Sequence, residues 1–391
     1  MMVIKVTVIV LINAFASMHV LAYIVNENSA KIQSQEDVAE PIQAIDLNST
    51  QQYVEHNGCP WVPKRFIYPS GAVELHTEIE QFFEYMQPTR TERALRERVV
   101  ARIKSVFYQL WPHAQLKLFG SVVIGLALPT SDIDLVGVGV SVPNRLQLLA
   151  TQILANNVAE PNSITIIDSA TVPIIKFVDR ESKINIDMKL CCDSSERQEV
   201  LMSEYKQKYP KFVKLTLVLK LLMKERGLNV RFTGGITSHA LTLMVINYLQ
   251  THPEDNNGAN LGDSLLGLLE LYGRKFNYTS TGITTLNGGA ILPRNELPCR
   301  LVKGQEQLFC IQDANNPSSN AGSGTYRAAN VIQAFDDAFV ALSMPISSNE
   351  RRAPNCTENS ILSRIIHIDG HFIKYRNWIR NTFGHILLSQ K

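Results

Sequence analysis

The run LFGSVVIGLALPTSDIDLVG, residues 118–137, decides how this chain folds. A short apolar segment ends at a Gly-Ser turn, and ten residues separate that turn from Asp132. Alternate side chains of a β-strand lie on one face, so Asp132 and Asp134 point the same way while Ile133 enters the core. Their Cα atoms are about 7 Å apart in such a strand, and both carboxylates can therefore bind one divalent metal ion.

A second apolar run, INIDM at residues 184–188, carries a third carboxylate. Its Ile and Met side chains share one face, and Asp187 lies on the other. If this strand neighbours the first, Asp187 joins Asp132 and Asp134. Three carboxylates without a cation repel and raise one another's pKa, so the pattern predicts a cage for Mg²⁺, with Mn²⁺ as a substitute. A two-metal site of this kind activates an attacking hydroxyl and holds a triphosphate.

Groups suited to phosphate flank these carboxylates. Gly120 allows a close backbone approach, and Ser121 supplies a hydroxyl and an N–H for phosphate oxygens. Residues 206–231 hold eight Lys or Arg against one acid, and the larger part of this cluster meets RNA phosphates or water. Lys220 and Lys224 lie four residues apart on one helix face, where they can hold a triphosphate tail. The alternative for such a run is a solvated basic face.

The composition limits the class of protein without identifying it. The chain has 391 residues, 45% of them hydrophobic and 19% charged. These values suit two globular domains and exclude a mainly disordered or coiled-coil chain. A net charge of +2 is too balanced for a polybasic binder, so contact with nucleic acid depends on local clusters of charge.

Two features disagree about the compartment. The six cysteines form no CxxC pair, which excludes a zinc finger and a dense disulfide framework and favours a reducing compartment. Residues 6–25, however, contain no Lys, Arg, Asp or Glu and are mostly apolar, as in a signal peptide or a membrane anchor. Such a leader together with Asp132 and Asp134 also fits a luminal glycosyltransferase, in which a DxD motif holds Mn²⁺ and a nucleotide sugar.

The spacing of apolar residues predicts an α+β fold, with helices before the sheet, a sheet crossed by one helix, and a mainly helical second half. The polar stretch at residues 26–60 indicates a linker. The predicted helices span residues 72–86, 91–111, 146–156, 212–226, 238–249, 261–272, 328–342 and 361–367, and the predicted strands span residues 116–119, 132–140, 172–178 and 184–190.

Several motifs, taken in their order along the chain, resemble the noncanonical poly(A) polymerases, which are nucleotidyltransferases of the DNA polymerase β superfamily. The likeness runs from about residue 60 to residue 384 and is greatest to the nuclear branch that works with the RNA exosome in TRAMP-type complexes. The motifs are FGS at residues 119–121, LPTSDIDLV at 128–136, ATVPIIK at 170–176, FTGGI at 232–236, ELYGR at 270–274 and YRNWI at 375–379.

The resemblance implies a polymerase β-like nucleotidyltransferase catalytic domain, made of a mixed sheet with helices, beside a mainly helical central domain with a PAP-associated region. The two domains enclose a nucleotide cleft. The expected parts are a leader and linker at residues 1–59, helices that pack with the central domain at 60–92, the catalytic domain at 93–205, the central domain at 206–385 and a tail at 386–391.

The same resemblance assigns roles to single residues. It implies that Asp132, Asp134 and Asp187 are catalytic and bind the metal ions, and that Gly120 and Ser121 contact the triphosphate of ATP. It further implies nucleotide-binding roles for the lysine and serine positions of the central domain: Lys220, Lys224, which matches a lysine of uridylyl-adding relatives, and Ser238. The implied activity is template-independent addition of AMP from ATP to the 3′ ends of nuclear RNAs, in RNA processing and quality control.

The chain departs from the family pattern where the base is recognised. His239 replaces the aromatic residue on which the base stacks. The nucleotide-recognition loop, residues 311–323, also differs, although Asn320 retains the groups needed to contact a base edge. Two alternatives therefore stay open: a uridylyl-adding variant, and a catalytically impaired member that binds RNA or protein partners.

Partners and location are further expectations. The resemblance implies RNA 3′ ends as substrate, RNA-binding zinc-knuckle proteins and helicase or exosome cofactors as partners, and the nucleus as location. Residues 6–25 oppose that location if they form a signal or an anchor, and a membrane is an expected partner only in that case.

Overall fold

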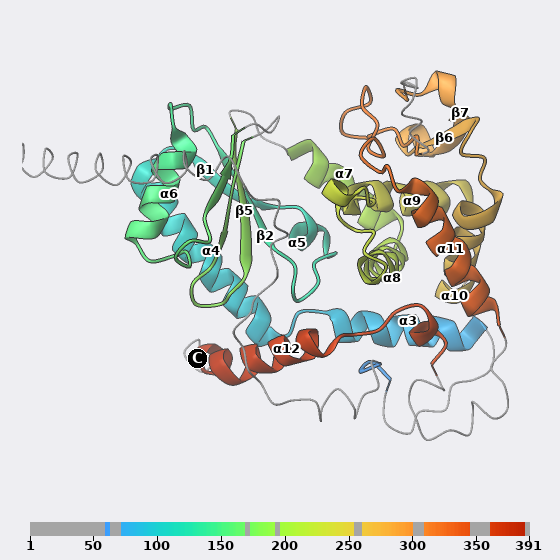
Figure 1. Ribbon diagram of the computed structural model, residues 1–391, viewed down its shortest axis with the longest axis horizontal. Helices are drawn as coiled ribbons and strands as arrows, with labels where there is room; N and C mark the ends of the chain where they lie inside the picture. Colours follow the sequence, from blue (N-terminus) through green and yellow to red (C-terminus); the bar gives the residue numbers. More distant parts are fainter. Residues whose placement is uncertain are drawn as a thin grey trace, which may run out of the picture.

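The computed structural model of the chain describes residues 59–62, 72–168, 173–191, 196–253, 260–299, 309–344 and 360–387. The apolar segment at residues 6–25 lies outside these ranges. Within them, no helix is both long enough and apolar enough to cross a membrane. A mixed sheet with its own helices forms one region, and a group of helices forms a second region beside it (Figure 1).

A five-stranded sheet forms the centre of the first region, with the strand order β1-β2-β5-β4-β3. The strands are β1 (Gln115–Phe119), β2 (Ile133–Val138), β3 (Thr165–Ile167), β4 (Ile174–Val178) and β5 (Asn185–Cys191). Strand β2 is antiparallel to β1 and parallel to β5. The apolar positions of both strands are buried, as in Ile133 and Ile186. The prediction that the two carboxylate-bearing strands are neighbours is therefore confirmed.

Helices α4 (Arg90–Leu110) and α6 (Arg145–Ala155) cover one face of this sheet with a continuous apolar core. Thr89 begins α4 with a capping box, in which Thr89 accepts from the Glu92 N–H and Glu92 accepts from the Thr89 N–H. The sheet lies close to α4 at Gly137, where a Cβ atom would be 2.6 Å from Leu190 and 2.7 Å from Phe107. A small residue there lets the helix approach the strands.

The second region is built mainly from the C-terminal half of the chain. Its helices α7 (Glu196–Lys208), α8 (Phe212–Glu225), α9 (Ser238–Thr251), α10 (Leu261–Glu270) and α11 (Ala328–Ser343) accompany a hairpin of β6 (Thr281–Thr284) and β7 (Ala290–Pro293). Helix α3 (Ala72–Met86) precedes the sheet in sequence but packs against α8 and α10. Its Leu75, Ile79 and Phe82 belong to the core of the helical region.

One predicted helix changes its form before it ends. The sequence predicts a single helix over residues 261–272, but α10 ends at Glu270 and continues as a π-helix, η3 (Leu271–Lys275). Gly273 lies against α11, where a Cβ atom would be only 2.7 Å from the backbone nitrogen of Asp336. The neighbouring Arg274 forms an ion pair with Asp336. Close contact with α11 accompanies this departure from α-helical geometry.

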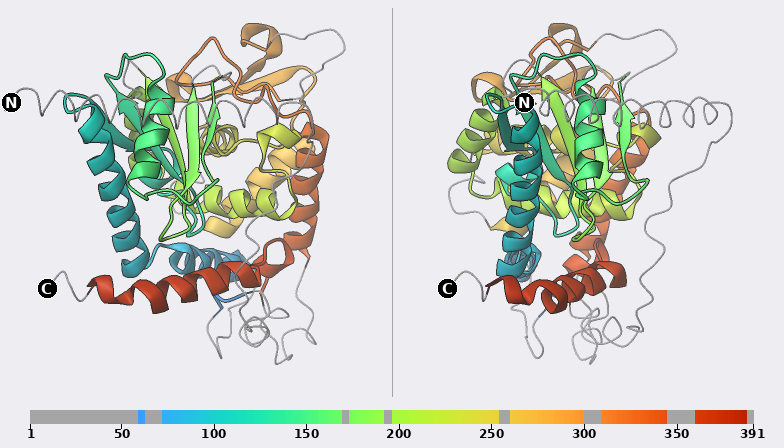
Figure 2. Two further views of the ribbon diagram at one scale, coloured as in Figure 1. Left: turned by 60° about the vertical axis from the view of Figure 1, so that its left-hand side comes forward. Right: turned by 90° about the vertical axis from the view of Figure 1, so that its left-hand side faces the viewer.

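The predicted helix at residues 361–367 is wrong. Only a 3₁₀ turn, η7 (Leu362–Arg364), forms there, and the true helix is α12 (Gly370–Phe383). The side chain of Asp369 accepts from the Phe372 N–H at 2.7 Å and so caps α12. Helix α12 runs beneath both regions (Figure 2). Helix α7 was not predicted either, because its sequence is strongly polar.

Cys299 and Cys310 form a disulfide, which the expectation of reduced cysteines did not foresee. Both residues are buried against Leu297 and the partly buried Leu292. Eleven residues of sequence separate the two cysteines, so no CxxC-like spacing indicated the pair. The bond joins the chain that follows β7 to the segment that leads into Ile311.

We expect reduction of this disulfide to destabilise the helical region. A Cys310→Ala variant should lose about 2–4 kcal/mol of unfolding free energy, because the cross-link restricts the unfolded chain. Urea denaturation of the wild-type protein and of the variant measures the difference. A reductant should lower the stability of the wild-type protein to that of Cys310→Ala and leave the variant unchanged. Equal stability of both proteins under oxidising conditions would contradict the assignment.

Candidate active site

The three carboxylates predicted from the sequence come together where β2 and β5 begin. Asp134 lies opposite Asp187 in the parallel register of these strands, and Asp132 directly precedes β2. The Asn185 side-chain amide donates to Asp132 Oδ1 at 3.2 Å. This hydrogen bond holds the Asp132 side chain toward β5, the strand that carries Asp187.

The charges of these carboxylates act on one another. The pKa of Asp134 is raised to about 6, chiefly by burial and then by the charges of Asp187 and Asp132. Burial also raises the pKa of Asp132, with the charge of Asp187 adding to the effect and the hydrogen bond from Asn185 opposing it. Mutual repulsion of this kind is the sign of a group of carboxylates that a cation would stabilise.

The arrangement fits a divalent cation in part. Asp132 and Asp134 supply the oxygen ligands that Mg²⁺ prefers, and burial, together with the charges of neighbouring carboxylates, raises the pKa of both. Asp187, by contrast, forms an ion pair with Lys176 of β4 at 2.5 Å. Among the described residues, no group of three or more His, Cys, Asp or Glu is arranged to hold a metal ion. The ion pair engages Asp187 Oδ2, so Lys176 competes with a cation for this carboxylate.

Gly120 is needed at the turn between β1 and α5 (Ser121–Ile124) for two reasons. Its φ angle of +73° lies in a region that side chains rarely adopt, and a Cβ atom would be 2.5 Å from Asp134 Oδ2. The turn therefore brings backbone atoms directly against the Asp134 carboxylate. Ser121 begins α5 and is partly exposed beside this turn.

Lys220 reaches across from the helical region to the catalytic region. It projects from α8, and its ammonium donates to the carbonyl oxygen of Leu126 at 3.0 Å. Burial lowers the pKa of Lys220, while the nearby charges of Asp134 and Asp132 raise it. A cation thus lies opposite the carboxylates and beside the Gly120 turn, where a bound polyphosphate would need positive charge.

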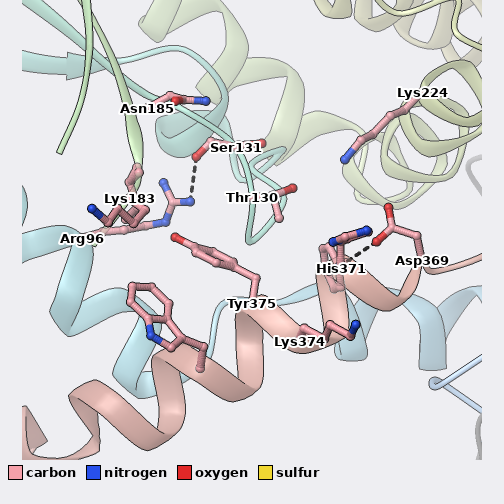
Figure 3. Close-up of a pocket in the computed structure, with 13 residues that line it drawn as sticks. Arg96, Thr130, Ser131, Lys183, Asn185, Lys224, Asp369, His371, Lys374 and Tyr375 are labelled. Carbon is pink, nitrogen blue, oxygen red and sulfur yellow. Dashed lines mark hydrogen bonds between the residues drawn. The ribbon is translucent and has the colours of Figure 1, made fainter. Parts of the chain in front are cut away.

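Lys224 lies one turn beyond Lys220 on α8 and borders a separate cavity. This cavity has a volume of about 490 Å³ and is also lined by Thr130, Ser131 and the first half of α12 (Figure 3). Lys224 is exposed, and its charge lowers the pKa of Lys220. The two lysines share a helix face, as predicted, but Lys224 points toward α12.

Ser238 and His239 begin α9, with Thr237 as the cap whose side chain accepts from the Ala240 N–H. Ser238 is exposed at this helix start. His239 is not free to present its ring, because its Nε2 lies 3.1 Å from Asp313 Oδ1. Burial by itself would raise the pKa of Asp313, but the hydrogen bond and the charge of His239 lower it.

Asn320 stabilises its own loop. Its Oδ1 accepts from the backbone N–H groups of Ile311 and Gly322, at 3.0 and 2.9 Å, and its Nδ2 donates to the carbonyl of Phe309 at 2.9 Å. The amide therefore already has partners on both of its polar atoms. A contact with a base edge would require Asn320 to give up part of this set.

Sequence reasoning missed other residues near the site. Asp313 was quoted as part of a loop but not as the partner of His239. Tyr375 and Trp378 of α12 belong to the YRNWI motif, for which the sequence predicted no role. Arg96 of α4 was not predicted to belong to the site. The signal that could have identified them is a basic and aromatic face at helical spacing, in Lys374, Tyr375 and Trp378.

Two family profiles match the chain. A profile described as "Poly(A) RNA polymerase, mitochondrial-like, central palm domain" matches residues 75–207, and one described as "Cid1 family poly A polymerase" matches residues 260–319. The first match contains the sheet and its carboxylates. The second contains α10, the hairpin and most of the loop with Asp313.

Relatives match over most of the chain. A Drosophila melanogaster protein, "inactive noncanonical poly(A) RNA polymerase protein Trf4-2", is 35% identical and covers 84% of this chain and 82% of its own length. The Schizosaccharomyces pombe poly(A) RNA polymerase cid14 is 32% identical, and the match spans 84% of this chain and 49% of that protein. The solved polymerase core of TRAMP, an RNA surveillance complex, is 28% identical with a TM-score of 0.64, over 75% of this chain and 93% of that one.

The mixed sheet, the carboxylates on its parallel strands and the adjoining helical region define a polymerase β-like nucleotidyltransferase. Within that class, the chain belongs to the noncanonical poly(A) RNA polymerases. This family acts on RNA, and the luminal glycosyltransferase alternative is therefore set aside.

The raised pKa of Asp134 makes the stability of the protein depend on pH. The folded state binds the Asp134 proton with a pKa of about 6, against an ordinary value of 3.8, so the folded state holds more protons between these values. The free energy of unfolding should therefore fall as pH rises through this window. An Asp134→Asn variant removes the charge, and its stability should exceed that of the wild-type protein above pH 6 and approach it near pH 4.

Urea denaturation across this pH range measures the difference in unfolding free energy. Asp168→Asn is the matched control, because Asp168 is exposed and accepts a hydrogen bond from Gln147 that Asn can also accept. A stability difference for Asp134→Asn that does not vary with pH would show that the carboxylates do not repel one another as the structure indicates.

Proposed function

We propose that this protein adds nucleotides to the 3′ ends of RNA without a template, using ATP as the preferred donor of AMP. The observation that carries the proposal is the coupling of Asp134 to both neighbouring carboxylates, with Lys220 directly across from them. Family membership supports the reaction class.

The residues of the site divide the work of phosphoryl transfer among them. Mg²⁺ or Mn²⁺, when bound, would supply the Lewis acid that activates the attacking hydroxyl and stabilises the leaving pyrophosphate. Asp132 and Asp134 would hold the ion, and Asp187 would join them in competition with Lys176. Lys220 would provide positive charge for the triphosphate. The Gly120 backbone lies beside Asp134, and there it would contact the phosphate oxygens that Lys220 also contacts.

The choice of ATP is the finer part of the proposal. It rests on the family's poly(A) members, such as the fission-yeast relative, whose printed name is poly(A) RNA polymerase. A uridylyl-adding enzyme is the alternative, because Lys224 matches that group and because His239 and Asn320 are engaged within the protein. Neither residue is arranged to discriminate between adenine and uracil in the form that the structure shows.

A catalytically impaired RNA- or partner-binding protein is the second candidate. The Drosophila relative named inactive is 35% identical, and two local contacts favour this reading: His239 is tied to Asp313, and Asp187 is tied to Lys176. Each contact gives a group of the proposed site a partner within the protein.

Partners and location are proposed from the relatives. The TRAMP polymerase core belongs to an RNA surveillance complex, which supports a role in RNA surveillance. The nucleus as location, and a zinc-knuckle protein and a helicase as partners, are proposed from the family resemblance of the sequence. The chain spans about half the length of the fission-yeast relative, so other parts of such proteins are not represented in the match. A nuclear location also has to be reconciled with the apolar segment at residues 6–25 and with the Cys299–Cys310 disulfide.

Asp187→Ala should abolish extension of an RNA primer with each of the four nucleoside triphosphates. Loss of a metal-binding carboxylate costs several kcal/mol in the transition state, which corresponds to a decrease of roughly 100-fold or more in rate. Gel electrophoresis of a labelled oligoadenylate measures extension, and circular dichroism checks the fold. Asp168→Asn serves again as the surface control. Undiminished extension by Asp187→Ala would refute the nucleotidyltransferase assignment, and no extension by the wild-type protein would favour the impaired alternative.

His239→Tyr should improve use of ATP, because it removes the partner of Asp313 and restores a larger stacking ring. Aromatic stacking contributes roughly 0.5–1.5 kcal/mol, so the KM for ATP should fall about 2- to 10-fold. Steady-state extension assays with ATP and UTP measure this change. The control is His385→Tyr, in the turn after α12 and far from α9 in the chain. An unchanged KM for both nucleotides would show that position 239 does not contact the base.

A further inference from the structure

The cavity beside Lys224 is lined by none of the residues Gly120, Ser121 and Lys220. It lies between the loop at Thr130 and Ser131, the chain around Lys183 and Asn185, and helix α12 (Figure 3). Its volume of about 490 Å³ accommodates groups of nucleotide size. Elements of the catalytic region and of α12 line it together.

Two residues that line the cavity lie next to Asp132. Ser131 directly precedes Asp132, and Asn185 donates to Asp132 at 3.2 Å, so two lining residues contact or neighbour this carboxylate. The Gly120 turn follows β1, which lies on the opposite side of β2 from β5. The Gly120 turn therefore lies on the β1 side of β2, whereas Asn185 of the cavity belongs to β5 on the other side.

Aromatic side chains of α12 form a stacking surface in this cavity. The rings of Tyr375 and Trp378 are 5.8 Å apart and inclined by 30°, and both line the cavity. They are partly buried, and Phe372 lies one turn before Tyr375 on the same side. Such surfaces bind unpaired nucleic-acid bases of any sequence, because every base presents a π face.

Cationic groups surround the stacking surface. Lys374 and Lys224 line the cavity, and neither lysine forms an ion pair with any of the described residues. Lys183 is already paired with Glu160 at 2.8 Å. Asp369 is the one carboxylate of the lining, and it caps α12 through the Phe372 N–H. The lining is thus positive overall.

Arg96 holds the wall of the cavity next to the carboxylates. Its Nη2 donates to the carbonyl oxygens of Pro129 and Ser131, at 2.8 and 2.7 Å. Its Nη1 is buried and has no hydrogen-bond partner in the part of the chain that the structure describes. The guanidinium fixes the loop that leads into Asp132 and adds positive charge to that wall.

We propose that this cavity holds the last nucleotides of the RNA primer and directs its 3′ hydroxyl to the Asp132 side of the carboxylates. A base stacks on Tyr375 and Trp378, and Lys374 contacts the phosphate that follows. This inference rests on the proposed function. A polynucleotide fits better than a second nucleoside triphosphate, because Gly120 and Lys220 do not line the cavity, whereas an aromatic pair does.

Two single variants of the full chain test the proposal by fluorescence anisotropy with a short fluorescein-labelled oligoadenylate. Lys374→Gln should weaken binding and lower the slope of log Kd against log salt by roughly 0.7, the value for one phosphate contact on a single strand. Trp378→Leu keeps an apolar side chain but cannot stack, so it should weaken binding roughly 5- to 100-fold and leave the salt slope unchanged. Lys104→Gln, at an exposed position of α4, is the control and should change neither quantity.

Extension assays separate this proposal from the proposed function. Both cavity variants should raise the KM for the primer and leave the KM for ATP unchanged. If both variants have the wild-type KM for the primer, the cavity assignment is overturned and the nucleotidyltransferase function still stands. If the wild-type protein binds RNA but extends no primer, and the variants lose RNA binding, the cavity assignment is supported and the proposed activity is refuted. A raised KM for ATP alone would show that the cavity binds the nucleotide, which also overturns the proposal.

Discussion

Repulsion between carboxylates on two parallel strands is the constraint on which the site depends. Asp134 and Asp187 occupy opposite positions of β2 and β5, and like charges directly across a sheet are destabilising. The buried side chains of the other strand face, such as Ile133 and Ile186, hold the strands in this register. The hydrophobic core thus supplies the free energy that keeps the carboxylates together until a cation or a proton neutralises them.

A second consequence concerns how the two regions are joined. Lys220 of the helical region is drawn to the carboxylates, and its bond to the Leu126 carbonyl links α8 to the loop before β2. Helix α12 makes the other link, because Arg376 contacts Glu92 at the start of α4 and the Tyr85 carbonyl at the end of α3. The floor of the site is therefore built by residues from three distant parts of the chain.

The parts that could be predicted are those set by local periodicity. The strands with Asp132, Asp134 and Asp187 follow from alternation over a few residues, and α3 matches its predicted bounds. The parts that could not be predicted depend on contacts between distant residues. The disulfide between Cys299 and Cys310, the pairing of His239 with Asp313 and the engagement of Asn320 require a folded loop, which no spacing rule describes. Helix α12 was missed because its apolar stripe is mixed with basic side chains.

The proposed phosphate end and the proposed base end of the site are two separate groups of residues. The first comprises Asp134, Gly120 and Lys220, which are coupled by charge and by close backbone contact. The second comprises His239 and its loop, which share no hydrogen bond with the first group in the described structure. A change at the base end can therefore alter which nucleotide binds without disturbing the groups that act on phosphate. Under the proposed function, the residue at position 239 bears on specificity, whereas the Lys176–Asp187 ion pair bears on how readily Asp187 binds a cation.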